Sequence, residues 1–215
     1  MTQDHCVAVL GLGYTGLPLA IAFVEAGFQV KGVDANERRV AELNARTSPI
    51  DDISDERLSN ALDAGLRVVS LDDARLSEAD AVFVCVPTPV TATKDPDLEP
   101  VLAAARYIRD HLRRGQLIVL QSTTYPGTTT GPFRKVLEES TLAAGIDFDL
   151  AYAPERVNPG DPASAARAVP RLVGASTADG TRRAAALLSS INDRVVEMTS
   201  PDAAELAKLL ENVFR

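Results

Sequence analysis

The sequence contains no tryptophan, and aromatic residues make up only 5% of its 215 residues. Its core must therefore be packed mainly by alanine, valine and leucine. No apolar run approaches the roughly 18 residues that a membrane-spanning helix needs. The segment 1–5 also lacks the basic and then apolar pattern of a secretory signal. We therefore expect a globular protein that does not associate with membranes.

Cysteine and histidine are equally scarce, with two of each. Cys6 and Cys85 both lie within apolar runs, which predicts reduced, buried thiols in a cytoplasmic protein rather than a disulfide. The two histidines have no cluster of cysteines or carboxylates at ligand spacing, so we expect no metal site. Acidic residues outnumber basic ones by 30 to 22, a net charge of −8. Because a nucleic-acid surface needs a concentrated basic patch, we expect no nucleic-acid partner.

The chain instead shows a regular alternation of short apolar runs and amphipathic stretches. The runs hardly alternate with polar residues, which is typical of strands that are covered on both faces of a parallel sheet. We expect strands at 6–10, 29–33, 66–69, 81–86, 117–120, 150–152, 171–173 and 194–196. We expect helices at 16–26, 37–44, 55–64, 99–112, 130–143, 178–191 and 201–215. Strands alternating with helices predict an α/β, doubly wound, mostly parallel sheet with helices on both faces.

The first expected strand runs directly into Gly11-Leu12-Gly13-Tyr14-Thr15-Gly16 and then into a helix. In a dinucleotide-binding domain, Gly11 permits the tight turn, Gly13 lets the backbone approach a pyrophosphate, and Gly16 lets the helix pack on the sheet. The helix N-terminus then faces the phosphates. The alternative is a glycine-rich turn without a ligand, but the strand before and the helix after the motif favour a nucleotide site.

An acidic residue, Asp34, ends the second expected strand and follows Gly16 by 18 residues, close to the ~20 that the dinucleotide motif requires. Its carboxylate is expected to accept hydrogen bonds from the adenosine ribose. A carboxylate at this position repels a 2′-phosphate and so favours NAD over NADP. Arg38 and Arg39 leave NADP open, because a nearby arginine can hold that phosphate.

Three further segments lie at the carboxyl ends of expected strands, where open α/β sheets bind ligands. They read Cys85-Val86-Pro87-Thr88-Pro89, Gln121-Ser122-Thr123-Thr124-Tyr125-Pro126-Gly127-Thr128-Thr129 and Ala153-Pro154-Glu155-Arg156-Val157-Asn158-Pro159-Gly160. Together with 11–18 and the closing segment 204–215, they resemble the UDP-glucose/GDP-mannose dehydrogenase family, in the family's order and over nearly the whole chain. The second and third segments are most similar to the UDP-N-acetylglucosamine 6-dehydrogenase branch.

The resemblance implies a Rossmann-type NAD-binding domain over 1–199 and the start of a central connecting helix over 200–215, with the downstream substrate domain absent. It also implies a four-electron oxidation in which the C6 alcohol of a UDP-sugar becomes a carboxylate and two NAD are reduced. A cysteine would carry the thiohemiacetal and thioester intermediates. That cysteine belongs to the family's second half, so we expect this chain to bind NAD but to be inactive alone.

Several roles carry over by resemblance. Thr123 matches the threonine that positions a catalytic water, and Glu155 matches the glutamate that assists proton transfer or thioester hydrolysis. Lys208 and Asn212 match the lysine and asparagine that stabilise oxyanions. The implied cofactor-binding residues are Gly11, Gly13, Tyr14, Thr15, Gly16, Asp34, Arg39, Pro87, Thr88, Pro89, Ser122 and Thr123. The implied substrate-binding residues are Glu155, Arg156, Val157, Asn158, Lys208 and Asn212.

Without the resemblance, each candidate catalytic residue has a simpler interpretation. Thr123 could be a turn residue that bonds to the backbone, and Glu155 could be a surface carboxylate beside Arg156. Lys208 and Asn212 are four residues apart and share one helix face. Spacing alone, however, favours Lys208 pairing with a neighbouring glutamate, Glu205 or Glu211, on a solvated surface.

Three functions remain open at this point: a UDP-sugar 6-dehydrogenase, a single-step hydroxyacid or sugar-phosphate dehydrogenase, and a non-catalytic NAD-binding module. One departure weakens the choice of sugar, because Asp161 stands where the most similar branch often has asparagine. We also expect a homodimer that forms through an apolar stripe on the last helix. That stripe consists of Ala204, Leu206, Ala207, Leu209, Leu210, Val213 and Phe214.

Overall fold

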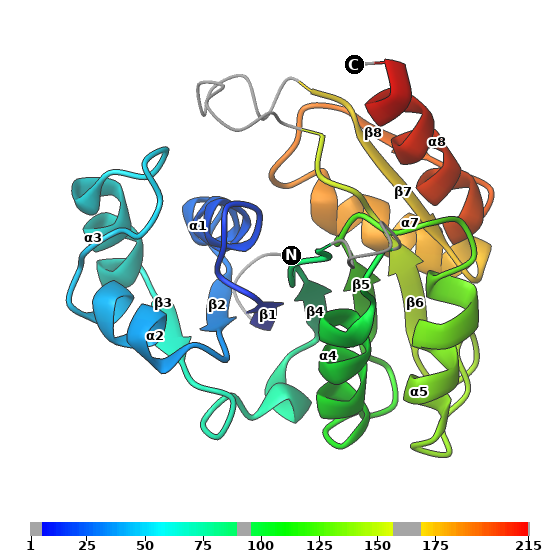
Figure 1. Cartoon of the computed structure of the whole chain (residues 1–215), viewed down its shortest axis with the longest axis horizontal. Helices are drawn as coiled ribbons and strands as arrows, with labels where there is room; N and C mark the ends of the chain where they lie inside the picture. The colour runs from blue at the N-terminus through cyan, green and yellow to red at the C-terminus, as the bar shows by residue number, and fades with distance from the viewer. Residues whose placement is uncertain (1–5, 90–95, 157–168, 215) are drawn as a thin grey trace.

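The computed structural model describes residues 6–89, 96–156 and 169–214. Eight strands form one sheet in the order β3-β2-β1-β4-β5-β6-β7-β8 (Figure 1). They are β1 (Cys6–Leu10), β2 (Gln29–Val33), β3 (Leu66–Val69), β4 (Ala81–Val84), β5 (Leu117–Leu120), β6 (Asp149–Tyr152), β7 (Arg171–Ala175) and β8 (Val195–Glu197). Among these pairings, only β6 with β7 is antiparallel. The expected doubly wound, mostly parallel sheet is confirmed.

Two separate apolar cores cover the two faces of the sheet. One core joins the strands to α1 (Gly16–Glu25), α2 (Glu37–Asn44), α3 (Asp55–Asp63) and α7 (Ala178–Leu188). The other joins them to η1 (Leu76–Glu78), α4 (Glu99–Arg109), η2 (Thr129–Phe133), α5 (Arg134–Glu138) and α8 (Pro201–Phe214). Successive residues of β1 alternate between the cores, with Val7 and Val9 in the first and Ala8 and Leu10 in the second. Burial on both faces is why the strands read as continuous apolar runs.

Side-chain caps fix the starts of α2 and α8. The Asn36 side chain accepts hydrogen bonds from the backbone N–H groups of Arg38 and Arg39 at the start of α2. Ser200 accepts one from the Ala203 N–H, at 3.1 Å, in the first turn of α8. Each cap satisfies backbone donors that the first turn of a helix leaves without an intrahelical partner.

Several expected elements are shorter than predicted: the helices over 99–112 and 178–191 end at Arg109 and Leu188. Two further cases have a cause in the residue types. The expected helix over 130–143 is broken into η2 and α5 and ends at Glu138, because Gly131 is non-helical and Pro132 follows it. The expected strand over 81–86 ends at Val84. Pro87 and Pro89 follow closely, and proline cannot donate a backbone hydrogen bond to a sheet.

The thiols and the last helix differ from expectation in burial. Cys85 is buried but Cys6 is only half-buried, and both thiols are free. Helix α8 packs on the sheet with Ala204, Glu205 and Lys208 buried. Ala204 therefore belongs to the core and not to an exposed stripe. The large apolar residues of α8 instead face solvent: Leu206, Leu209, Leu210, Val213 and Phe214.

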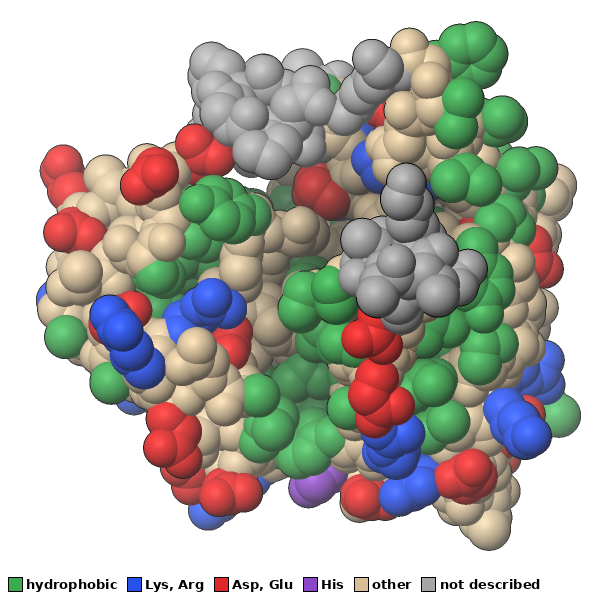
Figure 2. All heavy atoms as spheres, viewed as in Figure 1, with side chains coloured by type: hydrophobic (Ala, Val, Ile, Leu, Met, Phe, Trp, Pro, Cys, Tyr) green, Lys and Arg blue, Asp and Glu red, His purple; other side chains and the backbone are tan. Residues whose placement is uncertain are grey.

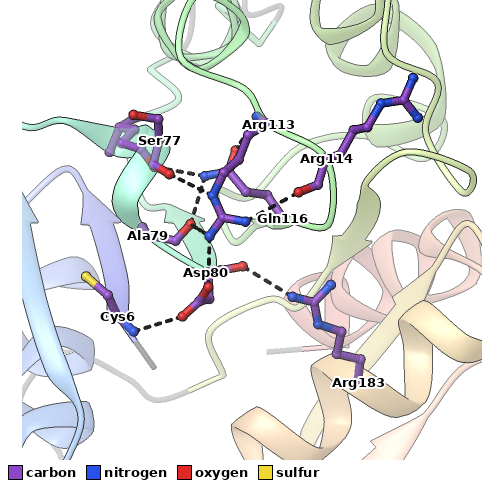
Figure 3. A network of polar contacts seen from close by, with 9 residues as sticks. Cys6, Ser77, Ala79, Asp80, Arg113, Arg114, Gln116 and Arg183 are labelled. Atoms are coloured by element: carbon purple, nitrogen blue, oxygen red, sulfur yellow. Dashed lines mark hydrogen bonds and ion pairs between the residues drawn. The ribbon is translucent and has the colours of Figure 1, made fainter. Parts of the chain in front are cut away.

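A polar network closes the amino end of the sheet (Figure 3). The Asp80 carboxylate accepts hydrogen bonds from the Cys6 N–H at 3.1 Å and from Arg113 Nη2 at 2.8 Å. The buried Gln116 amide donates to the carbonyls of Leu76 and Ala79, both at 2.8 Å. These contacts join β1, η1, β4 and the α4–β5 connection.

Candidate functional site

A cavity of about 760 Å³ opens at the carboxyl ends of the central strands. It lies beside the neighbouring strands β1 and β4, where the strand order reverses, the position at which doubly wound sheets bind ligands. The molecule is visibly hollowed there in Figure 2, with hydrophobic side chains on the floor of the hollow. The predicted residues that line the cavity are Gly11, Gly13, Tyr14, Thr15, Asp34, Arg39, Pro87, Thr88, Ser122, Thr123 and Glu155.

The three glycines of the elbow between β1 and α1 are required for different reasons. Gly11 has φ +94°, and a Cβ there would lie 2.8 Å from the Cys85 carbonyl oxygen. A Cβ on Gly16 would lie 1.8 Å from the Gly11 oxygen, so Gly16 allows the helix to approach the strand. A Cβ on Gly13 would meet nothing within 4 Å, although Gly13 lines the cavity. Gly13 therefore keeps open a space that the protein itself does not fill, beside the helix N-terminus.

Asp34 is buried at the end of β2 and lines the cavity. Its Oδ2 accepts a hydrogen bond from the Leu12 N–H of the elbow at 2.8 Å, and its Oδ1 accepts one from the Asn36 N–H at 2.8 Å. Arg39 Nη1 lies 3.2 Å from Oδ2. A carboxylate accepts about four hydrogen bonds in total, so Asp34 keeps capacity for a ribose hydroxyl.

The two arginines that left NADP open are separated by the structure. Arg38 pairs with Glu42 and its side chain is 86% exposed, whereas Arg39 lines the cavity and pairs with Asp34. The Asp34 carboxylate therefore offsets the charge of the arginine that reaches the site.

Sequence reasoning missed the apolar part of this cavity. This part is lined by Leu71 and by four residues of α4: Pro100, Ala103, Ala104 and Tyr107. The Tyr107 hydroxyl donates to the Leu71 carbonyl and joins the two segments. The apolar side of α4 was visible in the sequence, but nothing local showed that part of it faces a cavity rather than the sheet.

Cys85 lines the cavity directly after β4, and its thiol contacts Gln121 Oε1 at 3.4 Å. Burial raises the pKa of the Cys85 thiol far above its ordinary value, and the nearby Glu155 carboxylate adds to the effect. Because the thiolate is the nucleophilic form, Cys85 cannot act as a nucleophile near neutral pH. The half-buried Cys6 thiol also has a raised pKa, chiefly through burial.

The loop after β6 brings Glu155 to the cavity. Glu155 Oε2 lies 2.8 Å from Nη2 of the buried Arg171, at the start of β7. Its neighbour Arg156 does not line the cavity, and Arg156 Nε donates instead to Glu211 of α8 at 2.8 Å. The remaining predicted residues of this loop, Val157 and Asn158, lie outside the described residues.

The other predicted residues are placed as follows. Thr123 is exposed at the cavity. Gly16 and Pro89 are near it without lining it. Lys208 and Asn212 lie on α8 and do not line it either. Lys208 is only 6% exposed and Glu205 is fully buried, so the interpretation of Lys208 as half of a solvated ion pair with Glu205 is wrong.

The fold and the cavity define the class of protein. A glycine elbow at a helix N-terminus, an acidic residue at the end of the next strand and a cavity at the β1–β4 crossing are the features of a Rossmann-type dinucleotide-binding domain. Residues 5–192 match the UDP-glucose/GDP-mannose dehydrogenase family, NAD binding domain. The chain therefore belongs to this family, and its cofactor is NAD.

Similar proteins agree with this assignment. The chain is 34% identical to the UDP-N-acetyl-D-glucosamine 6-dehydrogenase of Pseudomonas aeruginosa, over 99% of this chain and 50% of that protein. It is 35% identical to the solved structure of the UDP-N-acetylmannosamine dehydrogenase of Pyrococcus horikoshii, with a TM-score of 0.90 over 98% of this chain and 50% of that one. It thus spans about half the length of these relatives.

A solved NDP-N-acetyl-D-galactosaminuronic acid dehydrogenase from Methanosarcina mazei is 36% identical, with a TM-score of 0.90 over 99% of this chain and 48% of that one. A mycobacterial 3-hydroxyisobutyrate dehydrogenase, at 20% identity and a TM-score of 0.66, shares the fold alone. In the part of the chain that the structure describes, no helix is long and apolar enough to cross a membrane.

Proposed function

We propose that this chain is the NAD-binding half of a dehydrogenase that oxidises the C6 alcohol of a UDP-N-acetylhexosamine to a carboxylate. Residues 1–199 would form the NAD domain, and 200–215 would begin a connecting helix to the substrate domain. One observation carries the proposal: Thr123 and Glu155 line the same cavity as the glycine elbow and Asp34. The names of relatives at 33–36% identity support the choice of an N-acetylhexosamine.

The reaction would use this half of the protein as follows. The elbow and Asp34 would hold the pyrophosphate and ribose, and bound NAD supplies the hydride acceptor in each of two oxidations. The first oxidation converts the alcohol to an aldehyde, which a cysteine outside this chain would trap as a thiohemiacetal. The second gives a thioester, and water releases the carboxylate and the thiol. Thr123 would orient that water and Glu155 would accept its proton.

Strand order supports this division of roles. The segments that line the cavity follow five strands that are consecutive in the sheet. In sheet order, Asp34 follows β2, the elbow follows β1, 85–89 follow β4, 121–123 follow β5 and 153–156 follow β6. The adenosine end would therefore lie by β2 and the reacting end by β5 and β6. The apolar residues Leu71, Ala103 and Tyr107 offer a surface for the adenine ring.

The cofactor proposal is tested by titrating this chain with NAD and NADP in a calorimeter. Wild type should bind NAD with preference over NADP. Asp34→Asn should lose about tenfold in NAD affinity, as expected when a ribose hydrogen bond to a charged acceptor is lost, and should lose much less toward NADP. Absence of binding at millimolar NAD would contradict the proposal.

The reaction proposal is tested in the protein expressed from its complete coding sequence. Two NADH per UDP-sugar consumed are expected, whereas one would indicate the single-step dehydrogenase and none the non-catalytic module. Comparing kcat/KM for UDP-N-acetylglucosamine, UDP-N-acetylmannosamine and UDP-glucose identifies the sugar.

We also propose that the protein acts in the cytoplasm and forms a homodimer through α8. Two free thiols are consistent with a reducing compartment. The exposed side chains of Leu206, Leu209, Leu210, Val213 and Phe214 form a row along α8, seen at the upper right of Figure 2. Rows of this kind are typical of interfaces. Sedimentation that shows monomer alone at high concentration would contradict the dimer.

A further inference from the structure

Glu205 is a fully buried carboxylate that binds backbone N–H groups. It lies on α8 and is 0% exposed. Its Oε2 accepts a hydrogen bond from the Gly127 N–H at 2.7 Å. Its Oε1 accepts from the Thr129 N–H at 3.0 Å, from the Thr129 hydroxyl at 2.6 Å and, more weakly, from the Thr124 hydroxyl at 3.4 Å. One carboxylate thus binds Thr124 and Gly127 of the loop between β5 and η2, and Thr129 at the start of η2.

Thr123 lies near the start of that loop, which follows β5 after Leu120, and its two neighbours in the chain are both anchored. The preceding residue, Ser122, donates its hydroxyl to the Val86 carbonyl at 2.7 Å. The following residue, Thr124, contacts Glu205. Thr123 itself is exposed at the cavity. The orientation of Thr123 is therefore set by the hydrogen bonds of its two neighbours. Glu205 of α8 accepts one of these bonds, from Thr124.

The same helix carries a second carboxylate that binds the other loop of the site. Glu211 Oε2 lies 2.8 Å from Nε of Arg156, whose neighbour Glu155 lines the cavity. Lys208 lies between the two glutamates in sequence. Helix α8 therefore holds the loop of Thr123 through Glu205 and the loop of Glu155 through Glu211.

We propose that Glu205 is a positioning residue that fixes Thr123 at the reacting end of the cavity and holds the Thr123 loop in register with α8. This inference rests on the proposed function, because it assigns Glu205 to the reaction through Thr123. Glu205 does not contact the cavity, so it acts on the loop and not on the substrate.

The arrangement requires a carboxylate and not only a polar side chain. Each of the two oxygens accepts a backbone N–H, from Gly127 and Thr129. A glutamine has one acceptor oxygen, so its amide would meet one of these N–H groups donor to donor. Glu205→Gln keeps the size of the side chain and leaves a buried donor unsatisfied in the loop.

The test is kinetic and uses the protein expressed from its complete coding sequence. Glu205→Gln should lower kcat by about 10- to 100-fold, the effect expected from misplacing a catalytic group by a fraction of an ångström to one ångström. Affinity for NAD should stay within about threefold, because the elbow and Asp34 follow β1 and β2, whereas this loop follows β5. The matched control is Asp202→Asn on the same helix, which alters a contact to the Thr130 hydroxyl and should leave kcat within about twofold.

A second variant keeps the test decisive if Glu205→Gln does not fold. Thr129→Val preserves the shape of the side chain and removes only its hydroxyl bond to Glu205. It should lower kcat in the same direction by a smaller factor, about two- to tenfold, again with NAD affinity retained. Substituting both residues should lower kcat by less than the product of the two single factors.

The possible failures are distinguishable. If wild type binds no NAD or releases no NADH from any UDP-sugar, the proposed function fails. If wild type is active but Glu205→Gln and Thr129→Val retain kcat within twofold, the positioning role is wrong. Equal losses of kcat and NAD affinity in both variants would mean general misfolding, and would also overturn it.

Discussion

The two ends of the sheet use their polar groups in opposite ways. At the amino end, the Asp80 carboxylate, the Arg113 guanidinium and the Gln116 amide bind one another and the surrounding carbonyls (Figure 3). At the carboxyl end, Asp34, Ser122, Thr123 and Glu155 line a cavity of about 760 Å³. Both sets of polar residues adjoin the same buried, apolar strands. The difference shows that polar residues at one end complete the fold, while those at the other remain available to a ligand.

The elbow at the carboxyl end is nevertheless needed for folding, and Gly16→Ala should have the largest effect of any change considered. Its Cβ would lie 1.8 Å from the Gly11 oxygen, a backbone atom that cannot move aside alone. We expect a loss of about 3 kcal/mol or more in unfolding free energy and loss of NAD binding. Urea denaturation and calorimetry check this. Wild-type stability would mean that α1 can shift at little cost.

At the amino end, Gln116→Leu should affect stability and leave binding intact. The side chain is 1% exposed, and its removal takes one donor from each of the carbonyls of Leu76 and Ala79. It also takes away the side-chain oxygen that accepts the hydrogen bond of the Arg113 N–H. We expect a loss of about 2 kcal/mol in unfolding free energy. NAD affinity should stay within twofold of wild type. A large fall in NAD affinity would contradict the independence of the two ends.

Gly13→Ala should show the reverse pattern, with little effect on stability and a clear effect on binding. A Cβ at Gly13 would contact no protein atom within 4 Å and would point into space that the cofactor pyrophosphate needs. We expect a loss of about tenfold or more in NAD affinity, or about 1.4 kcal/mol. The melting temperature should stay close to wild type. Unchanged affinity would place the pyrophosphate elsewhere.

The smallest expected effect is a pH dependence that belongs to the buried Glu205. Burial raises its pKa above the ordinary value, with hydrogen bonds from the loop acting in the opposite direction. The folded state therefore binds this proton more tightly than the unfolded state. The proton-linked part of the contribution of Glu205 to stability is full below the ordinary glutamate pKa, about 4.3, and is lost as the pH rises through the raised pKa. The hydrogen bonds from the Gly127 and Thr129 N–H groups to the carboxylate remain above that pH.

The measurement is the unfolding free energy of wild type minus that of Glu205→Gln, at several pH values between about 4 and 8. We expect this difference to fall as the pH rises. Asp202→Asn supplies a second check, because the Asp202 charge also raises the pKa of Glu205 and its removal should reduce the slope. A difference that grows with pH would mean that the hydrogen bonds outweigh burial.

The sequence predicted the parts of the molecule that depend on local pattern. The elbow and Asp34 each follow from residues that lie close together in the chain. The bounds of β1, β2, β3 and β5 were also predictable, because strands buried on two faces read as unbroken apolar runs.

The parts that could not be predicted depend on contacts between distant segments. Gln116 bonds a carbonyl 40 residues away, and Glu205 bonds Thr129, 76 residues away. Spacing within α8 therefore placed Lys208 and Glu205 on a solvated surface, whereas the structure buries both. The break at Gly131 and Pro132 was visible as residue types, but a helix tolerates proline in its first turn, so the pattern alone did not require a break.

The reversed polarity of α8 has a practical consequence for handling the protein. Its five large apolar side chains are exposed to solvent, while the Glu205 carboxylate and the Lys208 amine are buried. Attraction between such surfaces is driven by water entropy near room temperature and weakens on cooling. Dimers formed through this helix should therefore dissociate on cooling and re-form at room temperature. The oligomeric state measured by size-exclusion chromatography should then depend on the temperature of the column.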